Sequence, residues 1–225
     1  MELKIIGYIR NDYKEKFGIP RQSGLVKSAV SKIVFEPEYR DPNTVRGIEG
    51  YSHLWLLWQF SENVEAGWSP TVRPPRLGGN VRMGVFATRS PFRPNPIGLS
   101  CVELKSLKLT EEGPVLYVKG ADLMDRTPIF DIKPYVPYAD SYPEAESGFA
   151  GEVFGHHMKV EIPEQLLERI PKEKREAVIE MLAQDPRPGY QKNEERIYGI
   201  EYGNMNIRFR AEELRIIVTD VEQKR

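Results

Sequence analysis

The 225 residues of this chain are 40% hydrophobic and 29% charged, with a formal net charge of −1. This composition is typical of a folded globular protein, and the length suffices for one large domain or for a medium and a small domain, each with its own core. A nearly neutral chain is not a polycation, so binding of nucleic acid would require a local basic surface.

The cysteine content and the N-terminal sequence bear on the compartment of the protein. Cys101 is the only cysteine, so no internal disulfide can form, which favours a reducing compartment. The first apolar run is far too short for a signal peptide, and no stretch approaches the length of a membrane span. We therefore expect a cytoplasmic protein that does not bind membranes.

Short runs of β-branched and aromatic residues, separated by turn signals, follow one another from the N-terminus, and no convincing helical period occurs before about Glu161. Gly50–Phe60 is apolar on both faces, which predicts a fully buried strand, and Glu36–Arg46 is a connection or a short helix. This pattern favours an antiparallel-rich barrel or sandwich over a doubly wound sheet. The predicted strands are Leu3–Arg10, Ala29–Phe35, Gly50–Phe60, Val81–Ala87, Gly98–Leu109 and Val115–Gly120.

Arginine is concentrated in the window Ala66–Val102, which contains five arginines and no Asp, Glu or Lys. This bias indicates an anionic partner, because guanidinium groups bind carboxylate and phosphate through paired hydrogen bonds. Prolines and glycines in Leu77–Ser100 predict a rigid loop rather than a helix. An earlier stiff loop carries Arg21 and Gln22. For both loops, a solvated structural loop is the alternative.

Three acids, Asp122, Asp125 and Asp131, are predicted to lie close together at strand ends, beside Lys133 and Tyr135. Such a set can bind an ammonium group, a ribose or a metal ion, although Asp beside a turn often only caps the backbone. A metal is not expected, because no His or Cys is interleaved with these acids.

A Ser-, Gly- and Ala-rich segment, Ser141–Gly155, resembles a linker to a second unit. In this unit, Pro163–Gln184 has a helical period, and a stiff loop with Arg187 and Tyr190 follows it. Three strands then complete a unit of about seventy residues, small enough to lean on the first unit or on another subunit. These predicted strands are Arg196–Glu201, Asn206–Arg210 and Leu214–Val221, the first two joined by a turn at Gly203-Asn204.

Several nucleotide-binding and hydrolytic motifs are missing from the sequence. Neither G-x-G-x-x-G after a strand nor G-x-x-x-x-G-K-[ST] occurs, so a Rossmann site and a P-loop are both unsupported. Without G-x-S-x-G or a plausible Cys–His pair, nucleophilic hydrolysis is unsupported as well.

Two motifs resemble those of a known family: GVFATRSPFRPNPIGLS, at Gly84–Ser100, and DLMDRTPIFDIKPYVPYAD, at Asp122–Asp140. They are similar to the S-adenosylmethionine-dependent tRNA methyltransferases that modify N6-threonylcarbamoyladenosine at position 37, next to the anticodon. The resemblance extends through PRQSGLVKSA, SHLWLLW, PTVRPPRLGGN and the C-terminal AQDPRPGY, and so covers nearly the whole chain. The Arg/Pro motif is specific to this family.

The resemblance implies a mainly β, non-Rossmann protein with a single-sheeted, antiparallel-rich barrel, and a homodimer. Residues 1–150 would form the barrel that binds S-adenosylmethionine and leaves S-adenosylhomocysteine as product, and residues 151–225 a small α+β domain that contacts the tRNA anticodon arm. By matching position, the donor-binding residues would be Pro20, Arg21, Gln22, Ser61, Glu62, Arg89, Leu99, Leu123, Met124, Asp125 and Arg126.

No residue is a compelling general base, and the catalytic candidates stay open among Asp122, Asp125, Asp131 and Tyr135. Arg187 and Tyr190 are predicted to serve the tRNA, and Arg93 or Arg126 is predicted to bind the threonine carboxylate of the modified base. Two other functions remain possible from sequence: an RNA-binding module without catalysis, and a methyltransferase of the same fold with another substrate.

Overall fold

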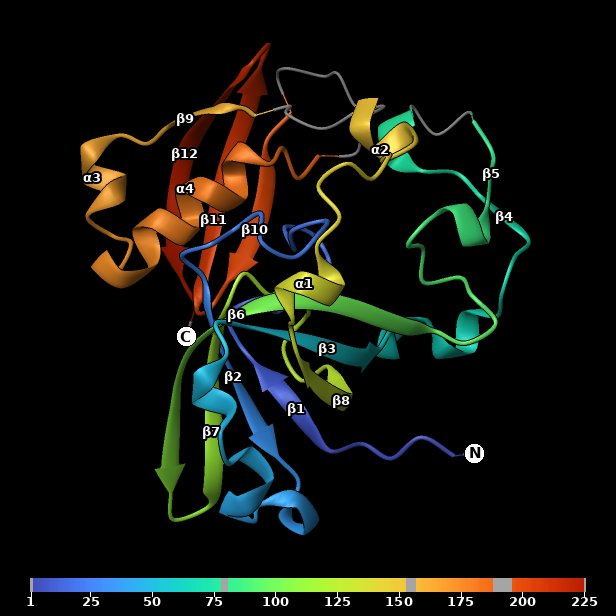
Figure 1. Cartoon of the computed structure of the whole chain (residues 1–225). Coiled ribbons are helices and arrows are strands. Elements are labelled where there is room, and N and C mark those ends of the chain that lie inside the picture. Colours follow the sequence, from blue (N-terminus) through green and yellow to red (C-terminus); the bar gives the residue numbers. More distant parts are fainter. Residues whose placement is uncertain (1, 78–80, 153–156, 188–195, 225) are drawn as a thin grey trace.

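The computed structural model describes residues 2–77, 81–152, 157–187 and 196–224. A β-barrel forms one end of the molecule and a four-stranded sheet with helices the other (Figure 1). Between β3 and β6, residues 60–96 leave the barrel at one side; we call this segment the excursion. None of the helices in the described ranges is both long and apolar enough to cross a membrane.

The barrel is closed by six strands in the order β1-β2-β7-β6-β3-β8, and all its pairs are antiparallel. The sequence predicted a mainly β, antiparallel-rich barrel or sandwich, and the structure confirms the barrel. The strands are β1 Gly7–Arg10, β2 Val30–Phe35, β3 His53–Gln59, β6 Ile97–Thr110, β7 Gly113–Lys119 and β8 Pro128–Pro134.

Strand β3 shows why one expectation was wrong. The sequence predicted a strand buried on both faces, but Leu54, Leu56 and Trp58 fill the barrel interior while Trp55 and Leu57 are only half-buried on the outside. A barrel buries one face of each strand, so apolar residues on the other face lie at the protein surface. The ring of Trp58 lies against Gly98, where an added Cβ would come within 2.2 Å of it.

Other differences lie at strand ends and in the connections. The first strand is shorter than predicted, since only Gly7–Arg10 pairs with β2. The predicted strand Val81–Ala87 is largely wrong: only β5 Met83–Gly84 pairs, with β4 Thr71–Val72, and a 3-10 helix follows it. The segment Glu36–Arg46, predicted as a connection or a short helix, contains two short 3-10 helices.

The second unit contains a sheet in the order β10-β11-β12-β9. The three predicted C-terminal strands are confirmed, but β9, which pairs in parallel with β12, was not predicted. The predicted helix Pro163–Gln184 is interrupted, with Pro171 at the start of a 3-10 turn between its two parts. The elements are β9 Lys159–Glu161, α3 Glu164–Leu167, α4 Arg175–Ala183, β10 Tyr198–Tyr202, β11 Met205–Glu212 and β12 Arg215–Gln223.

Two separate hydrophobic cores result, one inside the barrel and one between α4 and the second sheet. The second core also takes in Tyr13, Val26 and Ala29 from the loop between β1 and β2. The loop between β1 and β2 therefore packs with the C-terminal unit, although in sequence it lies between two strands of the barrel.

Two single-turn helices lie near the predicted linker: α1 Pro137–Asp140 just before it and α2 Phe149–Glu152 within it.

Candidate active site

A cavity of about 1760 Å³ lies between the loop after β1, the excursion and the segment that carries α2. Its described lining includes four arginines and one acid, Glu146. Three phenylalanines, Phe86, Phe92 and Phe149, add aromatic surface. Such a cavity suits a ligand that is both anionic and aromatic. The arginines are Arg21, Arg73, Arg82 and Arg89.

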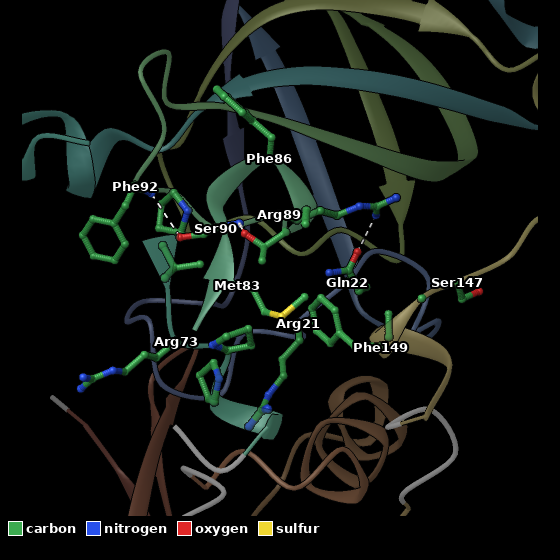
Figure 2. Close-up of a pocket in the computed structure, with 18 of the residues that line it drawn as sticks. Arg21, Gln22, Arg73, Met83, Phe86, Arg89, Ser90, Phe92, Ser147 and Phe149 are labelled. Atoms are coloured by element: carbon green, nitrogen blue, oxygen red, sulfur yellow. Dashed lines mark hydrogen bonds between the residues drawn. The ribbon is translucent and has the colours of Figure 1, made fainter. Parts of the chain in front are cut away.

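Arg89 and Gln22 join two distant segments within this cavity (Figure 2). The guanidinium NH1 of Arg89 donates a hydrogen bond to Gln22 Oε1. Arg21 also lines the cavity, and its NH2 donates to the backbone oxygen of Arg187 at 3.1 Å. The structure thus brings together three of the residues that the resemblance assigns to the donor.

A polar chain runs from the barrel interior to the loop that carries Gln22. Trp58 Nε1 donates to Ser100 Oγ at 2.9 Å, and Ser100 Oγ donates to Asp122 Oδ1 at 2.5 Å. The backbone N–H of Ser23 also favours the charged form of the Asp122 carboxylate. Burial raises the pKa of Asp122 to about 6, against the opposing effect of these hydrogen bonds and of the Arg89 charge.

The position of Asp122 explains how the assigned donor residues are connected. Three residues of this network are adjacent in sequence to assigned residues: Ser23 to Gln22, Ser100 to Leu99, and Asp122 to Leu123. Ser23 Oγ also accepts a hydrogen bond from Cys101 N at 3.2 Å, so the network connects three segments of the chain. Sequence reasoning found Asp122 as an acid but missed Ser23 and Ser100, since no local pattern marks a partner so far along the chain.

Replacing Asp122 with asparagine is expected to remove a pH dependence from the stability of the protein. On folding, the pKa of Asp122 rises from 3.8 to about 6, so its contribution to stability is fully present below pH 3.8 and is lost as the pH rises through about 6. Between roughly pH 4 and 7 the free energy of unfolding of the wild type should fall by about 2–3 kcal/mol relative to that of Asp122→Asn. Urea unfolding of both proteins across this range measures the difference; a difference that does not change with pH contradicts it.

Other assigned donor residues lie outside the described lining of the large cavity. Leu99 points outward from β6 and is 53% exposed, whereas Leu123 is buried. Ser61 and Glu62 begin an exposed 3-10 helix, and Lys16 Nζ reaches Glu62 O at 3.5 Å. The remaining members of this group are Pro20, which lines a small pocket beside Arg21, partly buried Met124 and Asp125, and exposed Arg126.

The catalytic candidates have separate partners rather than one shared site. Asp131 pairs with Lys133 at 2.8 Å, and Asp125 pairs with Lys14 at 2.8 Å. The ring of Tyr135 packs against His53 and Trp55. The predicted cluster of three acids is therefore divided among different contacts, and Asp122 is the member whose pKa is affected by Ser23, the residue next to Gln22.

Two of the residues predicted to contact the tRNA are already engaged in the protein. Arg93 NH1 donates to the carbonyl oxygens of Thr88, at 2.7 Å, and Val85, at 3.2 Å, which holds the turn of the Arg/Pro motif. Arg187 forms a bidentate pair with Asp185, at 2.8 and 3.0 Å, and its side chain is 13% exposed. Tyr190 lies outside the described residues.

Comparison with known proteins gives consistent matches over nearly the whole chain. Residues 8–141 match the family model for the tRNA-methyltransferase O N-terminal domain, and residues 155–224 match the TrmO C-terminal domain. The tRNA (adenine(37)-N6)-methyltransferase of Escherichia coli (strain K12) is 49% identical over 215 residues, 92% of this chain and 91% of that protein. A protein of the same name from Eikenella corrodens is 45% identical over 163 residues, 72% of this chain and 92% of that protein.

The fold is also similar to solved structures. A crystal structure of TrmO from Pseudomonas aeruginosa superposes with a TM-score of 0.79 at 33% sequence identity, covering 99% of this chain and 98% of that chain. Another TrmO crystal structure superposes with a TM-score of 0.80 at 35% identity, covering 98% of each chain. The likeness therefore includes both the barrel and the second unit.

Proposed function

Since the chain belongs to the tRNA-methyltransferase O family, we propose that it transfers a methyl group from S-adenosylmethionine to N6 of N6-threonylcarbamoyladenosine at position 37 of tRNA, in the cytoplasm. The observation that carries this proposal is the family match at both domains, residues 8–141 and 155–224. The cavity supports it, because arginines and aromatic side chains suit a negatively charged, base-containing substrate. S-adenosylhomocysteine is the second product.

The residues around Gln22 suit the donor. The amino-acid end of S-adenosylmethionine carries a carboxylate, which Arg89 or Arg21 can bind, and an ammonium group, which favours a carboxylate. Asp122 lies outside the described lining of the cavity but is close enough to Arg89 for that charge to lower its pKa, and it is our candidate for this role. The Gln22 amide oxygen accepts a hydrogen bond from Arg89 and so limits where the guanidinium points. A donor clamped at its charged end has a fixed direction for its reactive methyl group.

Methyl transfer depends more on the positioning of the two reactants than on acid–base catalysis. N6 attacks the methyl carbon in line while the carbon–sulfur bond breaks, its electron pair stays on sulfur, and N6 loses its proton. Most of the rate enhancement in such a displacement comes from holding the reacting atoms in contact. Arg89, Gln22 and Asp122 serve this role by fixing the loops around the donor, and a modest base or water suffices for the proton.

The two units divide the work in our proposal. Residues 1–150 bind the donor and carry out the transfer, and residues 151–225 contact the anticodon arm. Because the Arg187 guanidinium is paired with Asp185, we expect Arg187 to fix the backbone near Asp185 rather than to bind an RNA phosphate directly. Tyr190 stays a prediction for stacking of a nucleotide base.

The test is transfer of labelled methyl from S-adenosylmethionine to tRNA by the purified full-length chain. After nuclease digestion, mass spectrometry should find the added methyl on the threonylcarbamoyladenosine of position 37. A tRNA with another base at this position is the matched control and should gain no label. Binding of S-adenosylhomocysteine without transfer to any tRNA would instead favour a methyltransferase with a different substrate.

We further propose a homodimer through the outer barrel face of β3 and β6. Two apolar cross-strand pairs, Trp55 with Cys101 and Leu57 with Leu99, lie on this face. The substitution Leu57→Glu places a charge in this interface, so it should separate the dimer. The mass measured by sedimentation should then fall from twice 25.9 kDa to 25.9 kDa. Leu109→Glu, at the far end of β6, is the control and should stay dimeric. A wild type that sediments as a monomer at micromolar concentration would refute the dimer.

A further inference from the structure

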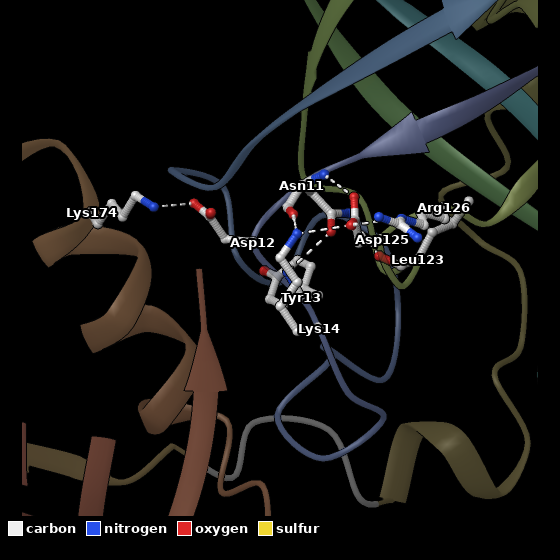
Figure 3. Close-up of polar contacts among 8 residues, drawn as sticks. All are labelled: Asn11, Asp12, Tyr13, Lys14, Leu123, Asp125, Arg126 and Lys174. Carbon is white, nitrogen blue, oxygen red and sulfur yellow. Dashed lines mark hydrogen bonds and ion pairs between the residues drawn. The ribbon is translucent and has the colours of Figure 1, made fainter. Parts of the chain in front are cut away.

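Residues 11–15, which we call the strap, follow β1 and contact both units of the molecule (Figure 3). Side chains at positions 11 and 14 point to the segment Leu123–Arg126, and those at 12, 13 and 15 contact the second unit. The strap is thus a short bridge between the assigned donor segment and the C-terminal unit.

On the barrel side, Asn11 and Lys14 hold Leu123 and Asp125 by hydrogen bonds. Asn11 Nδ2 donates to Leu123 O at 2.8 Å, and Asn11 N donates to Asp125 Oδ1 at 3.0 Å. Lys14 Nζ binds Asp125 Oδ2 at 2.8 Å (Figure 3). Burial of Asp125 acts to raise its pKa, but the bonds from Lys14 and Asn11 outweigh burial and lower it. Asp125 is therefore held as a carboxylate in one orientation.

The backbone adds to this attachment. Asp125 N donates to Tyr13 O at 2.8 Å, and Arg126 N donates to Ile9 O at 2.8 Å. Arg126 has a φ of 66°, an unusual conformation for a residue with a side chain, so the segment needs external support to keep its shape. The strap supplies this support at Leu123 and Asp125, and Ile9 of β1 supplies it at Arg126.

On the other side, the strap is fixed to the second unit by an ion pair, backbone bonds and aromatic packing. Asp12 Oδ2 pairs with Lys174 Nζ at 2.8 Å, and Gly203 N donates to Asp12 O at 2.8 Å. The buried ring of Tyr13 packs edge-on against Tyr202, with ring centroids 5.5 Å apart.

Gly203 shows how closely the two parts fit. It has a φ of 62°, and an added Cβ would lie 2.6 Å from Lys174 Nζ and 2.8 Å from Asp12 Oδ1. Asp12 is held by two groups of the second unit, Lys174 Nζ and Gly203 N. Because Asn11 and Lys14 bond to the segment Leu123–Arg126, the strap couples the position of this segment to that of the second unit.

We propose that Asn11 is a positioning residue for donor binding, and that through the strap the C-terminal unit sets the geometry of the donor segment. This rests on the proposed function, because the resemblance assigns Leu123–Arg126 to the donor. If RNA binds the second unit, coupling through the strap is reciprocal: tRNA and donor alter each other's affinity by the same factor.

The test is calorimetric titration of S-adenosylhomocysteine into the full-length wild type and four variants. Asn11→Ala removes the bond to Leu123 O and leaves this carbonyl without its partner, so the dissociation constant should rise about 10-fold. Asn11→Ser keeps a short acceptor for Tyr13 N but cannot reach Leu123; it should bind as weakly as Asn11→Ala while melting like the wild type. Lys174→Ala should weaken binding about 3-fold, since an ion pair of this kind contributes little.

Lys159→Ala is the control, because this exposed lysine pairs with Glu161 in the second unit without touching the strap. It should bind like the wild type. Unchanged binding of Asn11→Ala and Asn11→Ser, beside a wild type that binds, overturns the strap proposal alone. A wild type that binds no S-adenosylhomocysteine overturns the proposed function, and the strap proposal with it.

Discussion

A tRNA that carries threonylcarbamoyladenosine at position 37 is expected to be methylated at least about 100-fold faster than the same tRNA transcribed without modification. Two physical reasons support this difference. Acylation makes the remaining proton on N6 easier to remove, which matters because the described residues offer no compelling general base. The threonine carboxylate also offers a partner for an arginine, and the unmodified tRNA cannot form this ion pair.

The structure narrows the choice of arginine for that carboxylate. Of Arg93 and Arg126, the two that the sequence suggested, Arg93 already donates from NH1 to Val85 and Thr88. The side chain of Arg126 is 80% exposed, its Nε lies 3.9 Å from Asp125 Oδ2, and it is the last residue of the assigned donor segment. We therefore expect Arg126→Ala to reduce the preference for modified tRNA more than Arg93→Lys does.

Initial rates with labelled methyl donor measure the discrimination directly. The two tRNAs should be identical except for the modification, and each rate should be taken below saturation so that it reports kcat/KM. Equal rates on the two tRNAs would reject this account of specificity and favour a general adenine methyltransferase.

Local patterns were enough to predict most strands but not how they assemble. Turn residues and β-branched runs identified β2, β3, β6 and β7, and the turn between β10 and β11 was found at the correct residues. Closure of the barrel could not be read from these patterns, because it depends on β1 pairing with both β2 and β8. The parallel strand β9 was missed for the same reason: its partner β12 lies more than fifty residues later.

The candidate site shows the same limit. Residues of the arginine-rich, proline-stiffened window line the cavity, and the window could be found from sequence because charge bias and backbone stiffness are local properties. The role of Asn11 could not be predicted in this way, since its bond to Leu123 spans 112 positions of sequence. Phe149 was read as part of a linker, yet it lines the cavity. Residues that hold a distant segment in place are not marked by any pattern in the sequence around them.

Arg89→Ala is expected to weaken binding of S-adenosylhomocysteine by about 2–5 kcal/mol, which is roughly 30-fold to several thousand-fold in the dissociation constant. The magnitude assumes that Arg89 and the carboxylate of the ligand exclude water when they meet inside the cavity. Arg89 lines the cavity, and Gln22 Oε1 accepts a hydrogen bond from its Nη1 (Figure 2). The Arg89 side chain is exposed in the structure, so the bound ligand itself has to cover the pair. A contact at the exposed rim would cost much less.

Two companion variants separate charge from geometry. Arg89→Lys keeps the positive charge but loses the planar fork that matches a carboxylate, so its affinity should fall between those of the wild type and Arg89→Ala. Arg82→Ala is the matched control, because Arg82 lines the same cavity but makes only a 3.4 Å contact with Thr71. Calorimetry should find it close to the wild type. If Arg89→Ala leaves the affinity for S-adenosylhomocysteine unchanged and weakens binding of tRNA, Arg89 contacts a phosphate of the RNA instead. The carboxylate of the donor would then be bound by Arg21, which lies next to Gln22 in the same loop.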